Sequence, residues 1–338
     1  MIYPIFALTT RGLEDVTERE LSALPGIHHP QIAYRRVTAQ ADDLRALAGL
    51  RTADDVFLQV AHWADLTHTR QALHDVRDYA AQLELESALT ALRELRAIET
   101  APLFSVTVNF VGRRNTSAPE LKTALAKGVL DAYPDWAYTD DDASAQLNLR
   151  AFIDHADALV GVRLGERPLY RRAYKQAHLP GSLKPSVAAA LLSLLEAAPG
   201  ATLLDPFCGS GTLLAEAEAM GLRALGGDFD AIALHHAQAN TAVRVCQWDV
   251  AQLPLARAAF DYAAANLPWD RQVQVDGILS LLYEDALHEL QRVVKPGGRF
   301  ALLTSAPGLL QLPGVVISHQ REISLFGQTP TLLIIENQ

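Results

Sequence analysis

The chain has 338 residues, 49% of them hydrophobic, which is enough apolar material to build the cores of two or three domains. Its formal net charge of −10 at pH 7 argues against a protein that binds nucleic acid over most of its surface, so any RNA-contacting surface must be a local basic patch. The two cysteines, Cys208 and Cys246, lack metal-ligand spacing, and no apolar run reaches the roughly 20 residues that span a bilayer. The sequence also begins without a signal-peptide layout, so we expect a cytoplasmic protein with neither a metal nor a membrane partner.

Apolar periodicity predicts alternating strands and helices in the first half of the chain. In chain order these elements are a strand at Ile2–Thr10, a helix at Gly12–Leu21, a strand at Val56–Ala61, a helix at Leu83–Ile98, a strand at Phe104–Val111, a helix at Ala118–Ala132, and strands at Ala145–Ile153 and Ala158–Arg163.

A short basic run with interleaved tyrosines follows these elements. Its cations suit phosphate contact, and Tyr170 and Tyr174 suit stacking on bases. A basic run is more often solvated surface, so both interpretations stay open. The candidate RNA contacts are Arg163, Arg167, Arg171, Arg172 and Lys175.

The most informative stretch lies between Leu203 and Leu214. Asp205 stands at the tip of a short buried strand, and Gly209 and Gly211 let the backbone approach a ligand before the next helix begins. The stretch lacks the third glycine of the dinucleotide motif and the Lys-Ser/Thr of a P-loop. Because open α/β sheets bind ligands beyond their strand ends, this turn predicts a nucleoside pocket, although such a turn can also be only a tight connection.

Polar residues recur at the ends of the strands that follow. The predicted strands and the residues after them are Leu222–Gly227 with Asp228, Val243–Gln247 with Asp249, and Phe260–Ala265 with Asn266. Asp228 comes about 20 positions after the glycine turn, where doubly wound folds bind ribose hydroxyls. Asp249 could accept a hydrogen bond from an adenine amino group. Either aspartate could instead be a helix N-cap or a loop carboxylate.

The remaining elements complete a doubly wound α/β sheet. Lys295–Gly298 carries helix stop signals, and Gly327–Pro330 separates two β-rich segments as the turn of a terminal hairpin would. The predicted elements are helices at Leu213–Met220 and Ile278–Val294 and strands at Arg299–Thr304, Val315–Ser324 and Thr331–Glu336.

Four motifs together resemble the ordered motifs of class I S-adenosylmethionine-dependent methyltransferases. They are Asp205–Thr212, Gly227–Asp230, Asp249 and Asn266–Trp269. The Asn-Leu-Pro-Trp form of the last motif is similar to that of the RNA guanine-N2 branch. The upstream half, with Tyr170–His178 and Leu183–Leu191, resembles the THUMP-containing RNA methyltransferases of the TrmN type, which act on N2 of guanine 6 in tRNA.

This resemblance implies a fold and a division into domains. The implied fold is α/β, with a Rossmann-like seven-stranded methyltransferase sheet that has one antiparallel strand, preceded by a ferredoxin-like N-terminal piece and an α/β THUMP domain. The implied boundaries are residues 1–63 for the ferredoxin-like domain, 64–165 for the THUMP domain, 166–182 for a linker and 183–338 for the methyltransferase domain.

The resemblance also implies an activity, a cofactor and a partner. The enzyme would transfer a methyl group from S-adenosylmethionine to the exocyclic N2 of a guanine in the tRNA acceptor stem, giving N2-methylguanosine, while the THUMP domain grips the tRNA 3′ end. The implied cofactor contacts are Asp205, Pro206, Cys208, Gly209, Gly211, Asp228, Phe229 and Asp249. The implied catalytic residues are Asn266, Leu267, Pro268 and Trp269.

The chemistry of an exocyclic amine explains the residue types of the last motif. The lone pair of such an amine is delocalised into the ring, so carbonyl groups must accept its two protons and aim the nitrogen at the methyl group. Asn266 and the Leu267-Pro268 backbone can do this, while Trp269 offers a face for stacking. The chain departs from the commoner pattern at Leu267 and at Asp270, and Asp270 could accept the released proton or cap a helix.

Other interpretations remain open. The same Asn-x-Pro-aromatic chemistry would serve a methyltransferase for rRNA, DNA adenine or protein glutamine. The pocket could also belong to a non-catalytic RNA-binding module. The sequence does not fix which guanine is modified, whether one or two methyl groups are added, or the oligomeric state, for which a monomer is the expectation.

Overall fold

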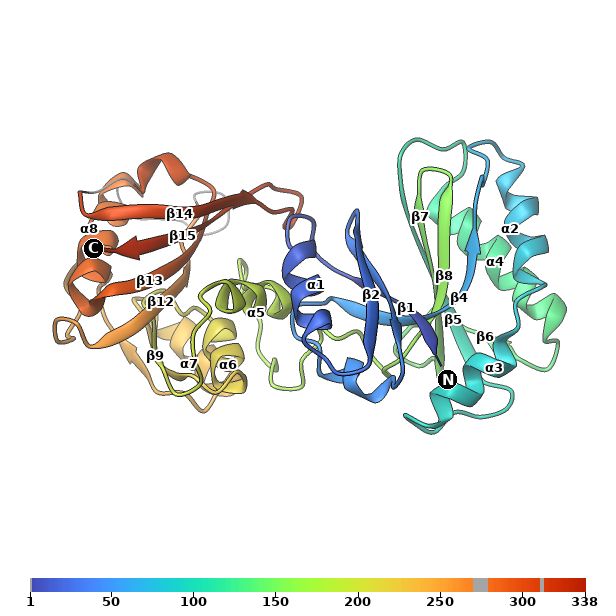
Figure 1. The fold of residues 1–338 in the computed structure, drawn as a ribbon, viewed down its shortest axis with the longest axis horizontal. Helices are drawn as coiled ribbons and strands as arrows, with labels where there is room; N and C mark the ends of the chain where they lie inside the picture. Colours follow the sequence, from blue (N-terminus) through green and yellow to red (C-terminus); the bar gives the residue numbers. More distant parts are fainter. Residues whose placement is uncertain (1, 270–278, 311–312) are drawn as a thin grey trace. The chain divides into compact units, whose positions relative to one another are not determined.

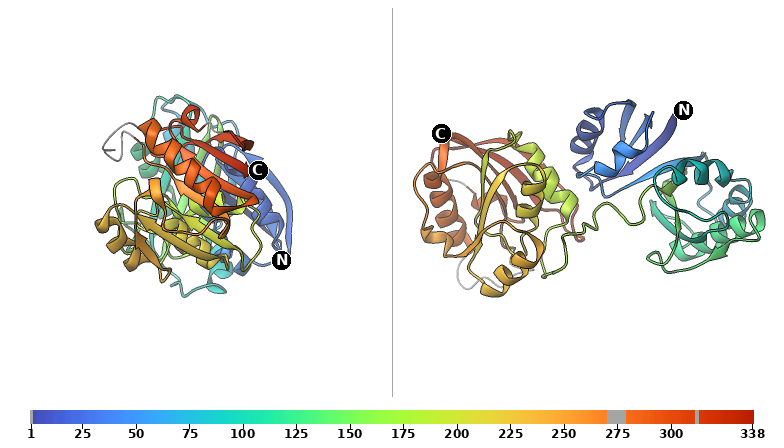
Figure 2. Two further views of the ribbon diagram at one scale, coloured as in Figure 1. Left: turned by 90° about the vertical axis from the view of Figure 1, so that its left-hand side faces the viewer. Right: turned by 90° about the horizontal axis from the view of Figure 1, so that it is seen from below.

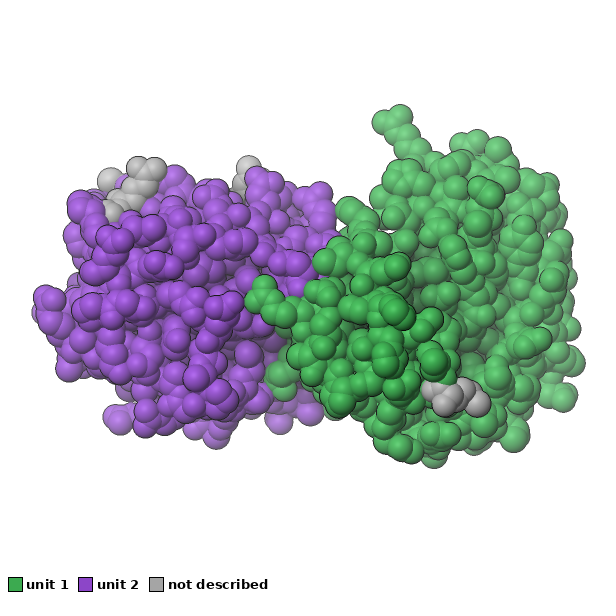
Figure 3. Space-filling model, viewed as in Figure 1, with its two compact units in different colours: residues 1–9, 17–169 green, residues 10–16, 170–338 purple. Residues whose placement is uncertain are grey.

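The computed structural model describes residues 2–269, 279–310 and 313–338. These residues form two compact units, which Figure 3 colours separately. The first unit holds the residues up to Thr9 together with Thr17–Leu169, and the second holds Thr10–Val16 together with Tyr170–Gln338. Asp270 and Ile278, which entered the sequence predictions, lie outside the described residues.

The first unit is built on one mixed eight-stranded sheet with the order β2-β3-β1-β4-β8-β7-β5-β6 (Figure 1). Strand β5 runs parallel to β6 and β7, and the other neighbouring strands are antiparallel. The strands are β1 (Tyr3–Leu8), β2 (Ile27–Ala33), β3 (Arg36–Ala41), β4 (Asp55–Trp63), β5 (Leu103–Val111), β6 (Ala137–Tyr138), β7 (Leu147–Asp154) and β8 (Asp157–Arg163). Because β4 pairs with β8, the regions predicted as ferredoxin-like and THUMP share a single sheet.

Helices α2 (Ala72–Ala80), α3 (Leu85–Arg93) and α4 (Ala118–Ala132) belong to the first unit. The start of α4 is fixed by a capping box, in which Ser117 and Glu120 satisfy each other's backbone N–H groups. A side chain at Gly128 would bring its Cβ 2.2 Å from the Arg77 carbonyl, so glycine lets α4 pack closely on α2. Leucine, valine and alanine side chains of the sheet and of these helices form one continuous core.

The second unit contains a seven-stranded sheet with the order β11-β10-β9-β12-β13-β15-β14 (Figures 1 and 2). Strand β15 is antiparallel to both of its neighbours, which confirms the expectation of seven strands with one reversed. The strands are β9 (Thr202–Asp205), β10 (Arg223–Asp228), β11 (Val245–Gln247), β12 (Phe260–Asn266), β13 (Val294–Thr304), β14 (Val315–Glu322) and β15 (Thr331–Asn337). The helices are α5 (Pro185–Leu194), α6 (Thr212–Ala219), α7 (Ala231–Asn240) and α8 (Leu279–Val293).

Strand β13 begins five residues earlier than the sequence predicts. Lys295–Gly298 was expected to separate helix from strand, but the strand follows α8 directly, and Val294 pairs with Phe260. The register shifts between Phe260 and Tyr262, and this irregularity accommodates the turn-forming glycines within the strand.

Residues Thr10–Val16, which lead into and begin helix α1 (Glu14–Ser22), are part of the second unit. Leu13 and Val16 are almost fully buried in its core, 1% and 0% exposed. Gly12 has a φ of +92°, and a Cβ there would lie 2.3 Å from the Glu322 carbonyl, so only glycine fits. The Arg321 guanidinium binds both Asp15 carboxylate oxygens and donates to the Gly12 carbonyl at 3.1 Å. Residues Thr10–Val16 are thereby held against strand β14.

None of the helices among the described residues is both long enough and apolar enough to cross a membrane. No group of three or more histidine, cysteine, aspartate or glutamate side chains in the described ranges is arranged to hold a metal ion.

Candidate active site

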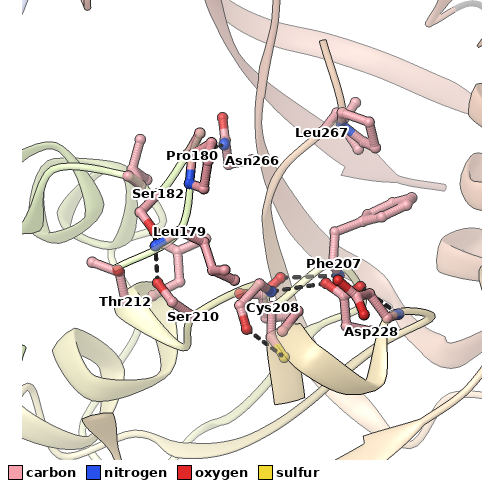
Figure 4. Close-up of a pocket in the computed structure, with 18 of the residues that line it drawn as sticks. Leu179, Pro180, Ser182, Phe207, Cys208, Ser210, Thr212, Asp228, Asn266 and Leu267 are labelled. Atoms are coloured by element: carbon pink, nitrogen blue, oxygen red, sulfur yellow. Dashed lines mark hydrogen bonds between the residues drawn. The ribbon is translucent and has the colours of Figure 1, made fainter. Parts of the chain in front are cut away.

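A cavity of about 350 Å³ lies at the carboxyl ends of β9, β10 and β12 (Figure 4). This is the edge at which open α/β sheets bind their ligands. Its walls come from three sources, namely the glycine turn after β9, the Asn-Leu-Pro-Trp segment after β12 and a loop that precedes α5. The lining residues are Leu179–Leu183, Asp205, Phe207–Ser210, Thr212, Leu213, Asp228, Asp230, Ala233 and Asn266–Trp269.

The turn after β9 is held by backbone hydrogen bonds, one within the turn and one to strand β10. The Cys208 N–H donates to the Gly227 carbonyl at 2.9 Å, and the Gly211 N–H donates to the Cys208 carbonyl at 2.7 Å. Gly209 and Gly211 both have positive φ, +50° and +77°. A Cβ on Gly209 would meet no atom within 4 Å, so the turn leaves open space on its cavity side.

Two carboxylates stand at the strand ends. Asp205 is 1% exposed and accepts a hydrogen bond from the Phe207 N–H at 3.2 Å. Asp228 accepts from the Gly209 N–H at 2.9 Å and from the Asp230 N–H at 3.0 Å, so it also clamps the glycine turn. Burial raises the pKa of Asp228, and it raises the pKa of Asp205 well above its ordinary value. A cationic or hydroxyl-bearing ligand would offset the energetic cost of burying these carboxylates.

The Asn-Leu-Pro-Trp segment presents an unsatisfied acceptor to the cavity. Asn266 Nδ2 donates a long bond of 3.4 Å to the Gly181 carbonyl, while its Oδ1 is buried without a hydrogen-bond partner in the described structure. The Leu267 N–H donates to the Leu303 carbonyl at 3.0 Å, and the Tyr283 hydroxyl donates to the Pro268 carbonyl at 2.8 Å. Native proteins rarely leave a buried polar atom unpaired, so the Asn266 oxygen points to a donor supplied by a ligand.

Sequence reasoning missed the wall formed by Leu179–Leu183. Its Ser182 hydroxyl lies 2.9 Å from the Ser210 hydroxyl and accepts from the Leu179 N–H at 3.0 Å. Asn240, which is 3% exposed, holds the preceding stretch by accepting from Ala177 N–H and donating to the Ser210 carbonyl. The sequence Pro-Gly-Ser ahead of α5 indicates a loop, but it does not indicate that this loop forms a wall of the cavity.

Four of the predicted cofactor contacts do not line this cavity, namely Pro206, Gly211, Phe229 and Asp249. Phe229 is 74% exposed, and Asp249 is exposed and accepts from the Ala251 N–H at 3.0 Å as the cap of a 3-10 turn. The Pro206 carbonyl accepts from the indole N–H of Trp248 at 3.1 Å. The capping role that was left open for Asp249 is therefore the one that the structure contains.

The basic run divides into buried and exposed cations. Arg163 is 3% exposed and pairs with Asp55 and Asp142. Arg172 binds the fully buried Glu216, while Lys175 donates to the Leu183 carbonyl and to the Thr212 hydroxyl. Burial lowers the pKa of Lys175 to about 8. These contacts argue against phosphate binding by Arg163, Arg172 and Lys175, whereas Arg167 and Arg171 are exposed.

Two family models match the second unit. Residues 172–234 match the RMKL-like methyltransferase domain, and residues 204–302 match a methyltransferase domain.

Among curated proteins, a tRNA (guanine(6)-N2)-methyltransferase of Thermus thermophilus is 32% identical over 342 residues, which cover 98% of each chain. The tRNA (guanine(6)-N(2))-methyltransferase THUMP3 of Mus musculus is 27% identical over 224 residues, covering 60% of this chain and 43% of its own.

Solved structures agree with these matches. TrmN from Thermus thermophilus superposes over the whole of both chains with a TM-score of 0.80 and 29% identity. SMU.472, whose structure was determined in complex with SAH, gives a TM-score of 0.77 at 17% identity and covers 100% of this chain and 98% of its own. This second likeness concerns the fold alone.

Proposed function

Because the chain belongs to the tRNA (guanine(6)-N2)-methyltransferase family, we propose that the cavity at the ends of β9, β10 and β12 binds S-adenosylmethionine. The enzyme directs the methyl group to the exocyclic N2 of guanine 6 in tRNA and gives N2-methylguanosine. The observation that carries the assignment of the site is the Oδ1 of Asn266, which is buried without a hydrogen-bond partner among the described residues and lies in the same cavity as Asp205 and Asp228.

The residues of the cavity fit this cofactor. Asp228 offers an ionic acceptor for ribose hydroxyls, and the open space over Gly209 allows the close approach of a ligand to the backbone. Asp205 offers a buried carboxylate that an amino group of the ligand would neutralise. When bound, S-adenosylmethionine supplies an electrophilic methyl group. We propose Asp205, Cys208, Gly209 and Asp228 as cofactor contacts and do not extend the proposal to Phe229 or Asp249.

The catalytic work of the chain is to orient the amine. Asn266 Oδ1 accepts one N2 proton, and a main-chain carbonyl accepts the other. The Pro268 carbonyl already accepts from the Tyr283 hydroxyl, so we assign the second proton to the Leu267 carbonyl. With both protons held, the nitrogen lone pair faces the methyl group, and the methylated amine loses one proton to solvent without a strong general base.

We further propose that the first unit, with its ferredoxin-like and THUMP regions, grips the 3′ end and acceptor stem of tRNA. The proposed boundaries remain residues 1–63, 64–165 and 166–182 for these regions and the linker. Arg167 and Arg171 are the members of the basic run whose exposure allows phosphate contact. Replacing each with alanine would lower the salt dependence of tRNA binding.

The decisive experiment treats unmodified tRNA with the full-length enzyme and S-adenosylmethionine and analyses the nucleosides by mass spectrometry. We expect N2-methylguanosine, and we expect it to vanish when adenine replaces guanine 6. Methyl on adenine, or methylation of rRNA in preference to tRNA, would contradict the substrate assignment. The absence of any S-adenosylmethionine binding by calorimetry would instead favour a non-catalytic RNA-binding protein.

A further inference from the structure

Lys175 connects two walls of the candidate cofactor cavity. Its ammonium donates to the Leu183 carbonyl at 2.7 Å and to the Thr212 hydroxyl at 2.9 Å. Leu183 lies in the loop ahead of α5, and Thr212 is the first residue of α6. Both of these residues line the cavity (Figure 4), whereas Lys175 does not. One side chain from the predicted linker therefore ties together two elements of the cavity wall.

The position of this ammonium is unfavourable by itself. It lies at the amino-terminal end of α6, where the helix dipole opposes a cation, and burial lowers its pKa to about 8. The fully buried Glu216, one turn further along α6, attracts the ammonium. Glu216 is itself bound by the Arg172 guanidinium at 3.1 Å and by the Tyr174 hydroxyl at 2.7 Å. A cation held in such a place, beside a binding cavity, indicates a functional use of its charge.

The bond from Lys175 also decides how the Thr212 hydroxyl can act. An ammonium group has donors only, so Thr212 Oγ1 must be the acceptor of this bond. The hydroxyl proton is then available to donate, and no acceptor for it occurs in residues 2–269, 279–310 or 313–338. Thr212 is 4% exposed and lines the cavity, so a ligand bound there can supply the acceptor.

The charges around the cavity indicate which part of S-adenosylmethionine supplies this acceptor. Asp205 and Asp228 favour its cationic and hydroxyl groups at the ends of β9 and β10. Lys175 and the amino-terminal end of α6 favour an anion next to Thr212. The carboxylate is the anionic group of this cofactor.

We propose that Lys175 is a positioning residue for the cofactor, which holds the Thr212 hydroxyl as a donor to the carboxylate of S-adenosylmethionine. This inference rests on the proposed function. The second bond of Lys175, to the Leu183 carbonyl, anchors the ammonium, and Lys175 itself does not touch the cofactor. A member of the basic run thus serves the cofactor instead of contacting RNA phosphates.

The test measures the binding of two ligands to the full-length protein by calorimetry. They are S-adenosylmethionine and its decarboxylated form, which keeps the sulfonium, the ribose and the amine. Lys175→Met should bind S-adenosylmethionine at least about tenfold more weakly than wild type, because a charge-assisted arrangement is lost. Its affinity for the decarboxylated ligand should stay within about threefold of wild type. Lys127→Met, at an exposed lysine of α4, is the matched control and should change neither affinity.

A double-mutant cycle distinguishes a role through Thr212 from a general loss of structure. Thr212→Val removes the hydroxyl and keeps the shape, so adding Lys175→Met to it should weaken S-adenosylmethionine binding by at most about twofold more. At saturating cofactor and tRNA, the rate of Lys175→Met should stay within about threefold of wild type. Equal losses for the two ligands, additive losses in the cycle, or wild-type affinity of Lys175→Met would overturn the inference. If the wild-type protein does not bind S-adenosylmethionine, the proposed function fails instead.

Discussion

The most direct test of the proposed chemistry is the replacement of Asn266 with alanine. The change removes the Oδ1 acceptor, and a hydrogen bond to a group that becomes charged is worth about 1.5–3 kcal/mol, or about 10- to 100-fold in rate. Because the N2 atom is also no longer oriented toward the methyl group, we expect the single-turnover rate to fall by a factor of about 10²–10³. The folded state loses only the 3.4 Å bond to the Gly181 carbonyl, so the free energy of unfolding should fall by about 0.5 kcal/mol.

The assay is single-turnover formation of N2-methylguanosine at saturating tRNA and S-adenosylmethionine, with cofactor affinity measured by calorimetry. Asn109→Ala, a change of the same type at an exposed position on β5, serves as the control and should leave the rate unchanged. The affinity of Asn266→Ala for S-adenosylmethionine should stay within about threefold of wild type, because the loss is confined to the reacting centre. A rate within twofold of wild type would refute the role assigned to the Asn266 oxygen.

Three further predictions concern the surroundings of this residue. Asp228→Ala should weaken S-adenosylmethionine binding at least about tenfold in calorimetry, because the variant loses an ionic acceptor and the hydrogen bond from the Gly209 N–H. Equal affinity of the two proteins would show that Asp228 does not contact the cofactor. Burial raises the pKa of Asp205 above its ordinary value of 3.8, so the folded state favours the protonated carboxyl. The stability that this group contributes is therefore fully present below pH 3.8 and is lost as the pH rises through the pKa of the folded state. Asp205→Asn should therefore melt at a higher temperature than wild type at pH 8, approach wild type in acid and bind the cofactor more weakly; a lower melting temperature at pH 8 would contradict this. Tyr283→Phe removes the donor to the Pro268 carbonyl and should lower kcat about fivefold with little change in the KM for S-adenosylmethionine, and a change in KM alone would contradict a positioning role.

The parts of the site that the sequence predicts are those that follow from strand order. Asp205, Asp228 and Asn266 each end a parallel strand, and the carboxyl ends of parallel strands meet at one edge of the sheet. Local patterns were sufficient to place these three residues together. The seven-stranded sheet and its reversed strand were predicted on the resemblance of the motifs, which span most of the second unit.

The parts that escaped prediction depend on partners distant in sequence. In the sequence Arg163 resembles its basic neighbours. In the structure it is buried in an ion pair with Asp55, which lies 108 residues earlier. The β2–β3 hairpin was missed because its two-residue turn, Tyr34-Arg35, has neither glycine nor asparagine, although Arg35 adopts a φ of +57°. The stretch that leads into the Leu179–Leu183 wall is held by Asn240, which lies in a helix 63 residues after its partner Ala177. No local pattern carries such information.

The insertion of Thr10–Val16 into the second unit sets an order on biosynthesis. Asp15 is synthesised before Arg321, which binds it and follows 306 residues later. Leu13 and Val16 therefore cannot be buried in this core until the residues around Ile323 have been made. The second unit completes its core only with a segment that was synthesised before most of the first unit. A fragment that begins at Tyr170 would carry an open apolar groove in place of these side chains, and supplying Thr10–Val16 as a separate peptide should restore its stability.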